Sequence, residues 1–234
     1  MCIRDRTVFA CKLGFPEEEL EKAIRSHPGQ RYSTSASLNL CVLKDGDTIN
    51  VGDYLFECIE TPGHTEGHIC LYESNKKIFI CGDHILGDIT PNITISSQER
   101  NPLKEYLMSL DKVYDLDVEL VLPGHRNIFR NYKERIRELK QHHQKRLREV
   151  ISILEKGRQN AFQIASQMTW DISYKSWDLF PPAQKFFAFG EAMAHLKYLG
   201  EEGEVGWEMD GQGIVFFITQ NNEEVHKWET LTLS

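Results

Sequence analysis

Two histidines and one aspartate each stand shortly after an apolar run that predicts a β-strand. They are His64, Asp83 and His125, and the runs before them cover residues 55–59, 77–81 and 118–122. Both histidines end a Pro-Gly-His turn, and loops at strand ends often carry functional side chains. Imidazole and carboxylate groups are ligands of zinc and similar metals, and a carboxylate can bridge two ions. The three positions therefore predict a metal site at the ends of three strands.

Each of these residues also has a plain structural interpretation when it is taken alone. His64 and His125 are then turn histidines, and Asp83 is a solvated carboxylate beside a hairpin. All three follow apolar runs in one chain, which favours the metal site. His142 and His143 are neighbours on a predicted helix and point apart, so a solvated or packing role is expected for them.

The strands that must position these residues are short and closely spaced. The strand candidates are residues 38–43, 48–51, 54–60, 69–72, 77–81 and 118–122. Tight turns join several of them: Asp-Gly-Asp at 45–47, Gly-Asp at 52–53 and Ser-Asn at 74–75. This spacing predicts a mostly antiparallel sheet, with Asp83 at the open end of a hairpin.

Capping residues and apolar spacing predict five helices. They cover residues 16–26, 101–114, 131–156, 160–168 and 181–199. Residues 1–6 do not read as a strand, a signal peptide or a helix start. Between residues 131 and 148 the longest helix carries seven Lys or Arg against two Glu. We interpret this basic face as solvated surface in preference to a phosphate-binding one.

The chain changes character from residue 157 onward. Apolar runs at 205–207 and 214–218 flank an Asp-Gly-Gln-Gly turn at 210–213, which predicts a β-hairpin. Two helices followed by such a hairpin predict a small winged-helix unit.

Composition excludes several classes of protein. The 234 residues include 27 basic and 35 acidic side chains, a net charge of −8 that gives no overall attraction to nucleic acid or to anionic membranes. No apolar run approaches the length of a membrane span, and no secretory segment is recognisable. The six cysteines all lie within the first 81 residues without a C-x-x-C pair, so reduced cysteines in a cytoplasmic protein are expected.

Three strings occur in an order and spacing that mark a known family. They are TPGHTEGHICLY, FICGDHILGDITPNI and ELVLPGH, followed by a long helix and a small tail. This set resembles the metallo-β-lactamase-fold hydrolases, within them the glyoxalase-II-like and β-lactamase-like-2 branch with a C-terminal winged helix. The resemblance implies an α+β fold: part of an αββα sandwich over residues 1–130, a connecting helix over 131–156 and a winged-helix domain over 157–234.

The resemblance also implies roles at the site. His64 matches a ligand of a first metal, Asp83 the carboxylate that bridges two metals and also serves catalysis, and His125 a ligand of the second. One or two zinc ions are expected, with iron or manganese as alternatives. Four further residues are expected to support or line the site: His68 by hydrogen bonding at a strand end, and His84, Thr65 and Asn92 beside it.

One element of the family pattern is missing. The first metal motif, His-x-His-x-Asp-His, is expected upstream of His64, where the chain has only His27. The expectation is that this chain is a fragment that begins after the first sheet of its domain, which puts its own metal affinity in question.

Three functions remain open from the sequence. The resemblance favours metal-dependent hydrolysis of thioesters of the acyl-glutathione or acyl-CoA type, with a small-molecule partner. The runner-up is hydrolysis of RNA phosphodiesters, which the winged helix and the basic helix keep open. A third alternative is a binding or regulatory protein with a degenerate metal site, to which the missing motif points.

Overall fold

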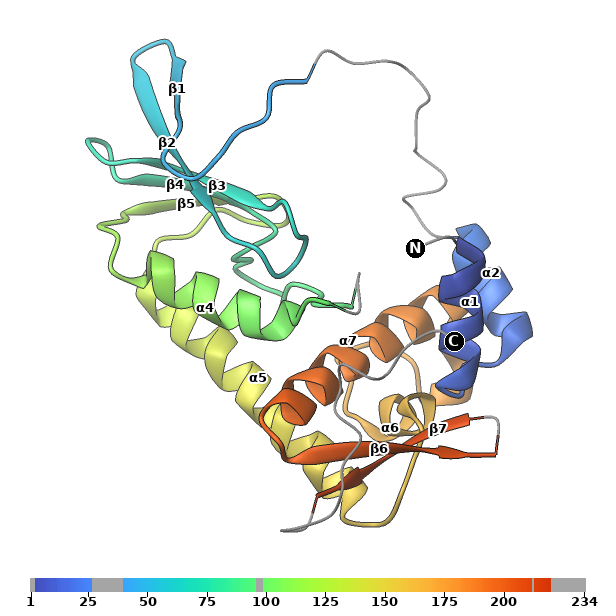
Figure 1. Ribbon diagram of the computed structural model, residues 1–234. Helices are drawn as coiled ribbons and strands as arrows, with labels where there is room; N and C mark the ends of the chain where they lie inside the picture. The colour runs from blue at the N-terminus through green and yellow to red at the C-terminus, as the bar shows by residue number, and fades with distance from the viewer. Residues whose placement is uncertain (1–2, 27–39, 96–98, 212, 220–234) are drawn as a thin grey trace. The chain divides into compact units, whose positions relative to one another are not determined.

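A computed structural model describes residues 3–26, 40–95, 99–211 and 213–219 (Figure 1). The chain forms two compact units. The sheet unit holds Ser37–Ile93 and Asn101–Gln144, and the helix-rich unit holds Met1–Ala36, Thr94–Arg100 and Lys145–Ser234. The sequence-based boundaries at residues 130 and 156 remain a prediction.

The sheet unit is built on five strands in the order β1-β2-β3-β4-β5. They are β1 (Thr48–Val51), β2 (Tyr54–Glu60), β3 (Ile69–Glu73), β4 (Ile78–Gly82) and β5 (Leu120–Pro123). The first four pair antiparallel in sequence, as the tight turns predicted. The prediction of a strand at residues 38–43 is wrong for residues 40–43, which form no strand. Residues 38 and 39 lie outside the described part of the chain.

The last two strands of the sheet run parallel. Ile78 pairs with Leu120 and Gly82 with Pro123, so β4 and β5 finish at the same edge. The start of β3 lies beside the end of β2, and β3 is antiparallel to β4, so β2 also finishes there. Strands β2, β4 and β5 therefore all end at the same edge of the sheet.

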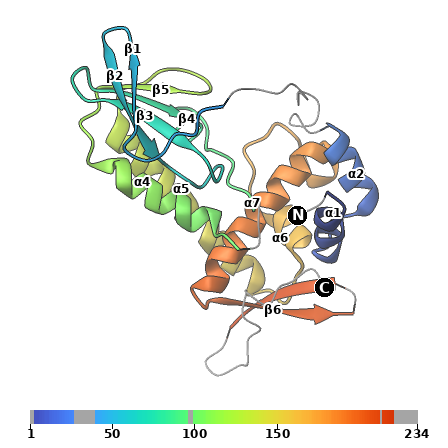
Figure 2. The same cartoon turned by 45° about the horizontal axis from the view of Figure 1, so that its top comes forward.

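Two helices cover one face of this sheet (Figures 1 and 2). They are α4 (Pro102–Tyr114) and the first part of α5 (Tyr132–Leu154). The Asn101 side chain accepts a hydrogen bond from the Lys104 N–H and caps α4, as the sequence predicted. The Tyr132 ring meets the Phe79 ring edge-on with centroids 5.5 Å apart. These contacts bury the helix-facing side of the sheet.

The helix-rich unit contains α1 (Ile3–Lys12), α2 (Glu17–Ser26), α6 (Ala161–Gln167), a 3-10 turn (Trp177–Leu179), α7 (Pro182–Glu201) and the hairpin β6 (Val205–Asp210) and β7 (Gly213–Ile218). Helix α1 corrects the expectation that the first residues start no helix. Phe9 near its end, and Leu13 just after it, pack into the core of this unit, and tertiary packing of this kind overrides weak local signals.

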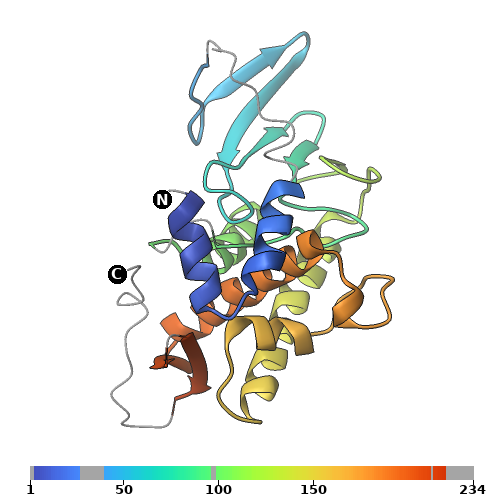
Figure 3. The ribbon, with the colours of Figure 1, turned by 90° about the vertical axis from the view of Figure 1, so that its right-hand side faces the viewer.

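Segments that are far apart in the sequence meet in this unit. Helix α2 lies beside α7 (Figure 3), and buried Lys185 of α7 contacts the Glu19 carboxylate at 2.8 Å. The Asn160 and Gln163 side chains form a reciprocal cap at the start of α6, at the predicted position. Within the described residues, no helix combines the length and the apolar character needed to cross a membrane.

Candidate metal centre

The three predicted ligands converge at the edge where β2, β4 and β5 finish. His64 Nε2 lies 3.5 Å from Asp83 Oδ2, and His125 Nε2 lies 3.5 Å from Asp83 Oδ1. The side chains of His64 and Asp83 are 27% and 29% exposed, whereas His125 is 66% exposed. The aspartate therefore stands between two imidazoles, with one carboxylate oxygen facing each.

Two glycines let the backbone come close enough for this arrangement. The Gly124 N–H donates to the Gly82 carbonyl at 2.7 Å, which joins the chain after β5 to the chain after β4. A Cβ atom on Gly124 would lie 2.7 Å from Asp83 Oδ1 and would displace the carboxylate. Gly82 has φ +48°, a conformation that side chains rarely adopt.

The orientation of His64 is set by the loop after β4. Its Nδ1 lies 2.8 Å from the backbone carbonyl of Asn92. A carbonyl can only accept, so Nδ1 carries a proton, and in the neutral ring the lone pair then lies on Nε2, which faces Asp83. Asn92 thus contributes its backbone to the site. No sequence pattern could predict this contact, because a backbone carbonyl has no residue signature.

His68 contacts the backbone of Asp83. Its Nε2 accepts the backbone N–H of Asp83 at 3.2 Å, and its Nδ1 lies 2.8 Å from the Thr61 hydroxyl. Burial, and secondly the charge of nearby His64, lower the pKa of His68, which favours the neutral ring that this hydrogen bond needs. Because Nε2 accepts from the Asp83 amide, its lone pair is already used in this hydrogen bond.

Two other predicted residues, His84 and Thr65, do not contact the three converging side chains in any hydrogen bond or ion pair described here. His84 was expected to line the site, but it is fully buried, with its ring centroid 5.3 Å from that of Tyr106. Burial, reinforced by His68, lowers the pKa of His84 to about 3. Thr65 is exposed, and its carbonyl accepts from the N–H groups of Gly63 and His68, so it shapes the turn.

The distances test whether these residues suit a metal. An N–H···O hydrogen bond spans about 2.7–3.2 Å, whereas two ligands of one tetrahedral zinc ion lie about 3.4 Å apart. The observed separations of 3.5 Å are close to the second value, and they also fit an ion pair between a protonated histidine and the carboxylate. No group of three or more His, Cys, Asp or Glu that could hold a metal occurs among the described residues. Each imidazole with its facing oxygen would therefore supply two of the four ligands that a tetrahedral zinc ion takes.

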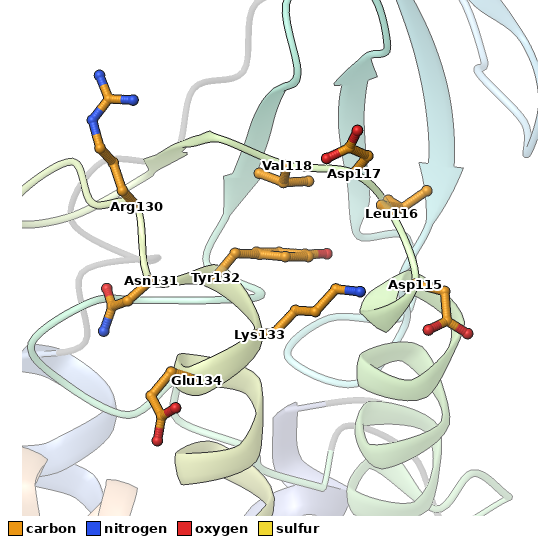
Figure 4. A pocket seen from close by; sticks show the side chains of 9 residues that line it. All are labelled: Asp115, Leu116, Asp117, Val118, Arg130, Asn131, Tyr132, Lys133 and Glu134. Atoms are coloured by element: carbon orange, nitrogen blue, oxygen red, sulfur yellow. The ribbon is translucent and has the colours of Figure 1, made fainter.

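A cavity of about 420 Å³ lies elsewhere in the sheet unit (Figure 4). It is lined by Asp115, Leu116, Asp117, Val118, Arg130, Asn131, Tyr132, Lys133 and Glu134. These residues lie before β5 and at the start of α5, whereas His125 follows the end of β5. The cavity is thus separate from the three converging side chains.

Comparison with known proteins identifies the fold. Residues 12–125 match the model of the Metallo-beta-lactamase superfamily, and residues 177–220 match that of the Metallo-beta-lactamase-like, C-terminal domain. The chain has a metallo-beta-lactamase fold. The match of the second model extends the likeness to α7, β6 and β7.

Individual relatives agree with this assignment of the fold. The crystal structure of a metallo-beta-lactamase family protein from Thermus thermophilus superimposes with a TM-score of 0.71 at 32% identity, over 89% of this chain and 62% of that one. The Beta-lactamase-like protein 2 homolog of Caenorhabditis elegans is 30% identical over 69% of this chain and 50% of its own length. The Acyl-coenzyme A thioesterase MBLAC2 of Bos taurus is 38% identical over 44% and 38% respectively. The matched part thus spans half or less of these two curated relatives.

Proposed function

We propose that this chain is part of a metal-dependent hydrolase that cleaves thioesters of the acyl-CoA or acyl-glutathione type. The observation that carries the proposal is Asp83 placed between His64 and His125, with one oxygen toward each. This arrangement suits a carboxylate that bridges two divalent ions, zinc first and iron or manganese as alternatives.

The roles of the chain's own residues follow from their contacts. A bound divalent metal supplies an activated water and polarises the carbonyl to be attacked. His64, Asp83 and His125 would hold it. The Asn92 carbonyl keeps the lone pair of His64 Nε2 directed at the site, and His68 holds the backbone of Asp83. Partners of this kind orient ligands before the metal binds.

The choice of thioesters rests on the relatives. A protein 38% identical over 113 residues is named an acyl-coenzyme A thioesterase. Hydrolysis of such a substrate adds water across the C–S bond and yields a carboxylic acid and a free thiol. The five described cysteines are unpaired, which suits the reducing cytoplasm where we place the protein.

The basic side chains of α5, which suggested RNA as an alternative substrate, give that alternative little support in the structure. Arg137 of α5 pairs with Glu134, and Lys140 pairs with Asp111. Side chains already neutralised by their neighbours release few counterions from a phosphate backbone. The net charge of −8 acts in the same direction.

Thiol release tests the proposal directly. The chain is incubated with zinc, iron or manganese and with a panel of acyl-CoA and acyl-glutathione thioesters, and free thiol is measured with a chromogenic disulfide. We expect metal-dependent release that Asp83→Asn abolishes and that Asp53→Asn, in an exposed turn, leaves unchanged. Metal-dependent cleavage of single-stranded RNA without thiol release would overturn the ranking. Zinc binding without any turnover would favour the binding-protein alternative.

A further inference from the structure

Arg135 of α5 is turned inward, unlike its neighbour Arg137 on the same helix. Arg135 donates from Nε to the Leu86 carbonyl at 2.7 Å and from Nη2 to the Ile89 carbonyl at 2.8 Å. Its Nη1 donates to Glu138 at 2.8 Å. The side chain is only 13% exposed, whereas that of Arg137 is 51% exposed. Arg135 is therefore committed to the loop that follows β4.

That loop carries the group that orients His64. Residues 83–93 leave the sheet after β4, and near their end the Asn92 carbonyl accepts from His64 Nδ1. Ile85 and Ile93 are fully buried and anchor the two ends. The carbonyls at 86 and 89 lie between these anchors, in a stretch without regular secondary structure. The path of the loop up to Asn92 thus depends on side chains that reach it from outside.

We propose that Arg135 is a positioning residue for the candidate metal centre, holding the loop so that the Asn92 carbonyl fixes the tautomer of His64. The role of Arg135 in metal binding rests on the proposed function, whereas its hydrogen bonds to the loop do not. A guanidinium presents several N–H groups in one rigid plane, so it can hold two carbonyls at a fixed spacing. An ammonium is a single point and cannot reproduce that geometry.

Other contacts on the loop do not replace Arg135. The Asn127 amide donates to the Asp88 carboxylate at 3.1 Å, and the Phe129 ring lies against Gly87. Both act on the middle of the loop, and neither satisfies the carbonyls of Leu86 or Ile89. Loss of Arg135 would leave these two acceptors without the partners that the structure gives them.

The tautomer of His64 is the direct readout. Imidazole ¹⁵N shifts are recorded on the metal-free full chain, with the His64 signals identified by their loss in His64→Gln. We expect a protonated Nδ1 in the wild type. Arg135→Ala should give a mixture of the two tautomers. Arg135→Lys keeps the charge and serves as the test variant if Arg135→Ala does not fold. Its ratio of tautomers should lie between that of the wild type and that of Arg135→Ala. Arg137→Ala, two positions along the helix, should match the wild type.

Metal binding provides the second readout. Zinc affinity, measured by calorimetry, should fall by about 10–100-fold in Arg135→Ala, the size of effect found for residues that orient ligands. A wild-type tautomer in both Arg135 variants would overturn the inference, as would a wild-type His64 that carries its proton on Nε2. Absence of binding of zinc, iron and manganese together with the expected change of tautomer would refute the proposed function and leave the positioning role of Arg135 standing.

Discussion

At the scale of single residues, Asp83 holds the candidate centre together because its two oxygens face different histidines. His64 is oriented through its other ring nitrogen, while His125 is the most exposed member and has no comparable partner among the contacts described above. The half of the site around His64 is therefore better ordered in advance than the half around His125. Preorganised ligands lose less conformational freedom when a metal binds.

Removing the charge of Asp83 should affect both halves at once. We expect Asp83→Asn to weaken zinc binding by at least about 100-fold, more than loss of an orienting partner costs. His125→Ala should weaken it less, because the His64 half remains. Isothermal titration of zinc into the chain measures both, with Asp53→Asn as the control. Equal zinc affinity in the wild type and in Asp83→Asn would show that Asp83 is not a metal ligand.

The hydrogen bond from the Asp83 amide to His68 makes a separate prediction. In His68→Gln the side-chain oxygen can still accept from the Asp83 N–H, whereas His68→Leu leaves that donor without its partner and removes the contact with the Thr61 hydroxyl. We expect zinc affinity to fall about 10-fold or more in the leucine variant and to be largely retained in the glutamine variant. A ligand role for His68 would instead make the two variants equally defective.

The residues that the sequence could predict are those with a side-chain signature. His64, Asp83 and His125 were predicted from turns after apolar runs, and the structure brings them together. Arg135 was interpreted as part of a solvated basic face, because its inward turn depends on where the loop carbonyls lie in space. His84 was expected beside the metal, yet the turn after Asp83 directs its side chain into the interior.

At the scale of elements, the parallel pairing of β4 and β5 brings Asp83 and His125 to one edge. The sequence predicted the capped helices and tight hairpins well, since these depend on local residues such as Asn101 and Asn160. It failed for residues 40–43, which are apolar but find no neighbouring strand. It also missed α1, whose helix is stabilised by burial of Phe9 and Leu13 against distant segments.

The Asp45 carboxylate, just before β1, links the end of β2 to α4, and Lys112 Nζ also donates to the Glu60 carbonyl at 3.0 Å. Asp45 accepts from the Glu60 N–H at 2.8 Å and from Lys112 Nζ at 2.5 Å. The hydrogen bond from Lys112, and secondly that from Glu60, lower the pKa of Asp45 from its ordinary 3.8. The ionised form therefore stabilises the folded state above about pH 4, and this contribution is lost as the pH falls through the folded pKa.

Asp45→Asn should accordingly lower the free energy of unfolding by about 0.5–1 kcal/mol at neutral pH, a modest value because the carboxylate is half exposed. The difference from wild type should persist down to about pH 5 and shrink below about pH 4. Urea unfolding across this pH range measures it. Asp53→Asn, which lacks such contacts in the described structure, should show no pH-dependent difference. A gap between Asp45→Asn and wild type that stays constant at low pH would contradict the assignment.

At the scale of the whole molecule, two units with separate cores share one chain. The candidate centre lies entirely in the sheet unit, because all of its residues fall within Ser37–Ile93 and Asn101–Gln144. A ligand stabilises the part of a protein that binds it in the folded form, and an excess of about 100 times its dissociation constant adds about 2.7 kcal/mol. The effect of zinc should therefore be unequal along the chain.

Hydrogen exchange with and without zinc tests this expectation. Peptides from residues 48–93 and 101–144 should exchange more slowly when zinc is present, whereas peptides from 158–211 should change little. Asp83→Asn should abolish the difference. Uniform protection of both units would show that they unfold as one, and protection confined to 158–211 would place the metal elsewhere.

The pairing of α2 with α7 has a consequence for biosynthesis. Glu19 and Lys185 are 166 residues apart, so the first helices leave the ribosome long before their partner is made. At about 5–20 residues per second, this delay is about 8–33 seconds. Phe15 and Leu20, almost fully buried in the folded protein, cannot reach their neighbours in α7 during that interval. The residues of the sheet unit, Ser37–Ile93 and Asn101–Gln144, are translated within this interval, so burial of Phe15 and Leu20 against α7 is a late step that follows synthesis of the whole sheet unit.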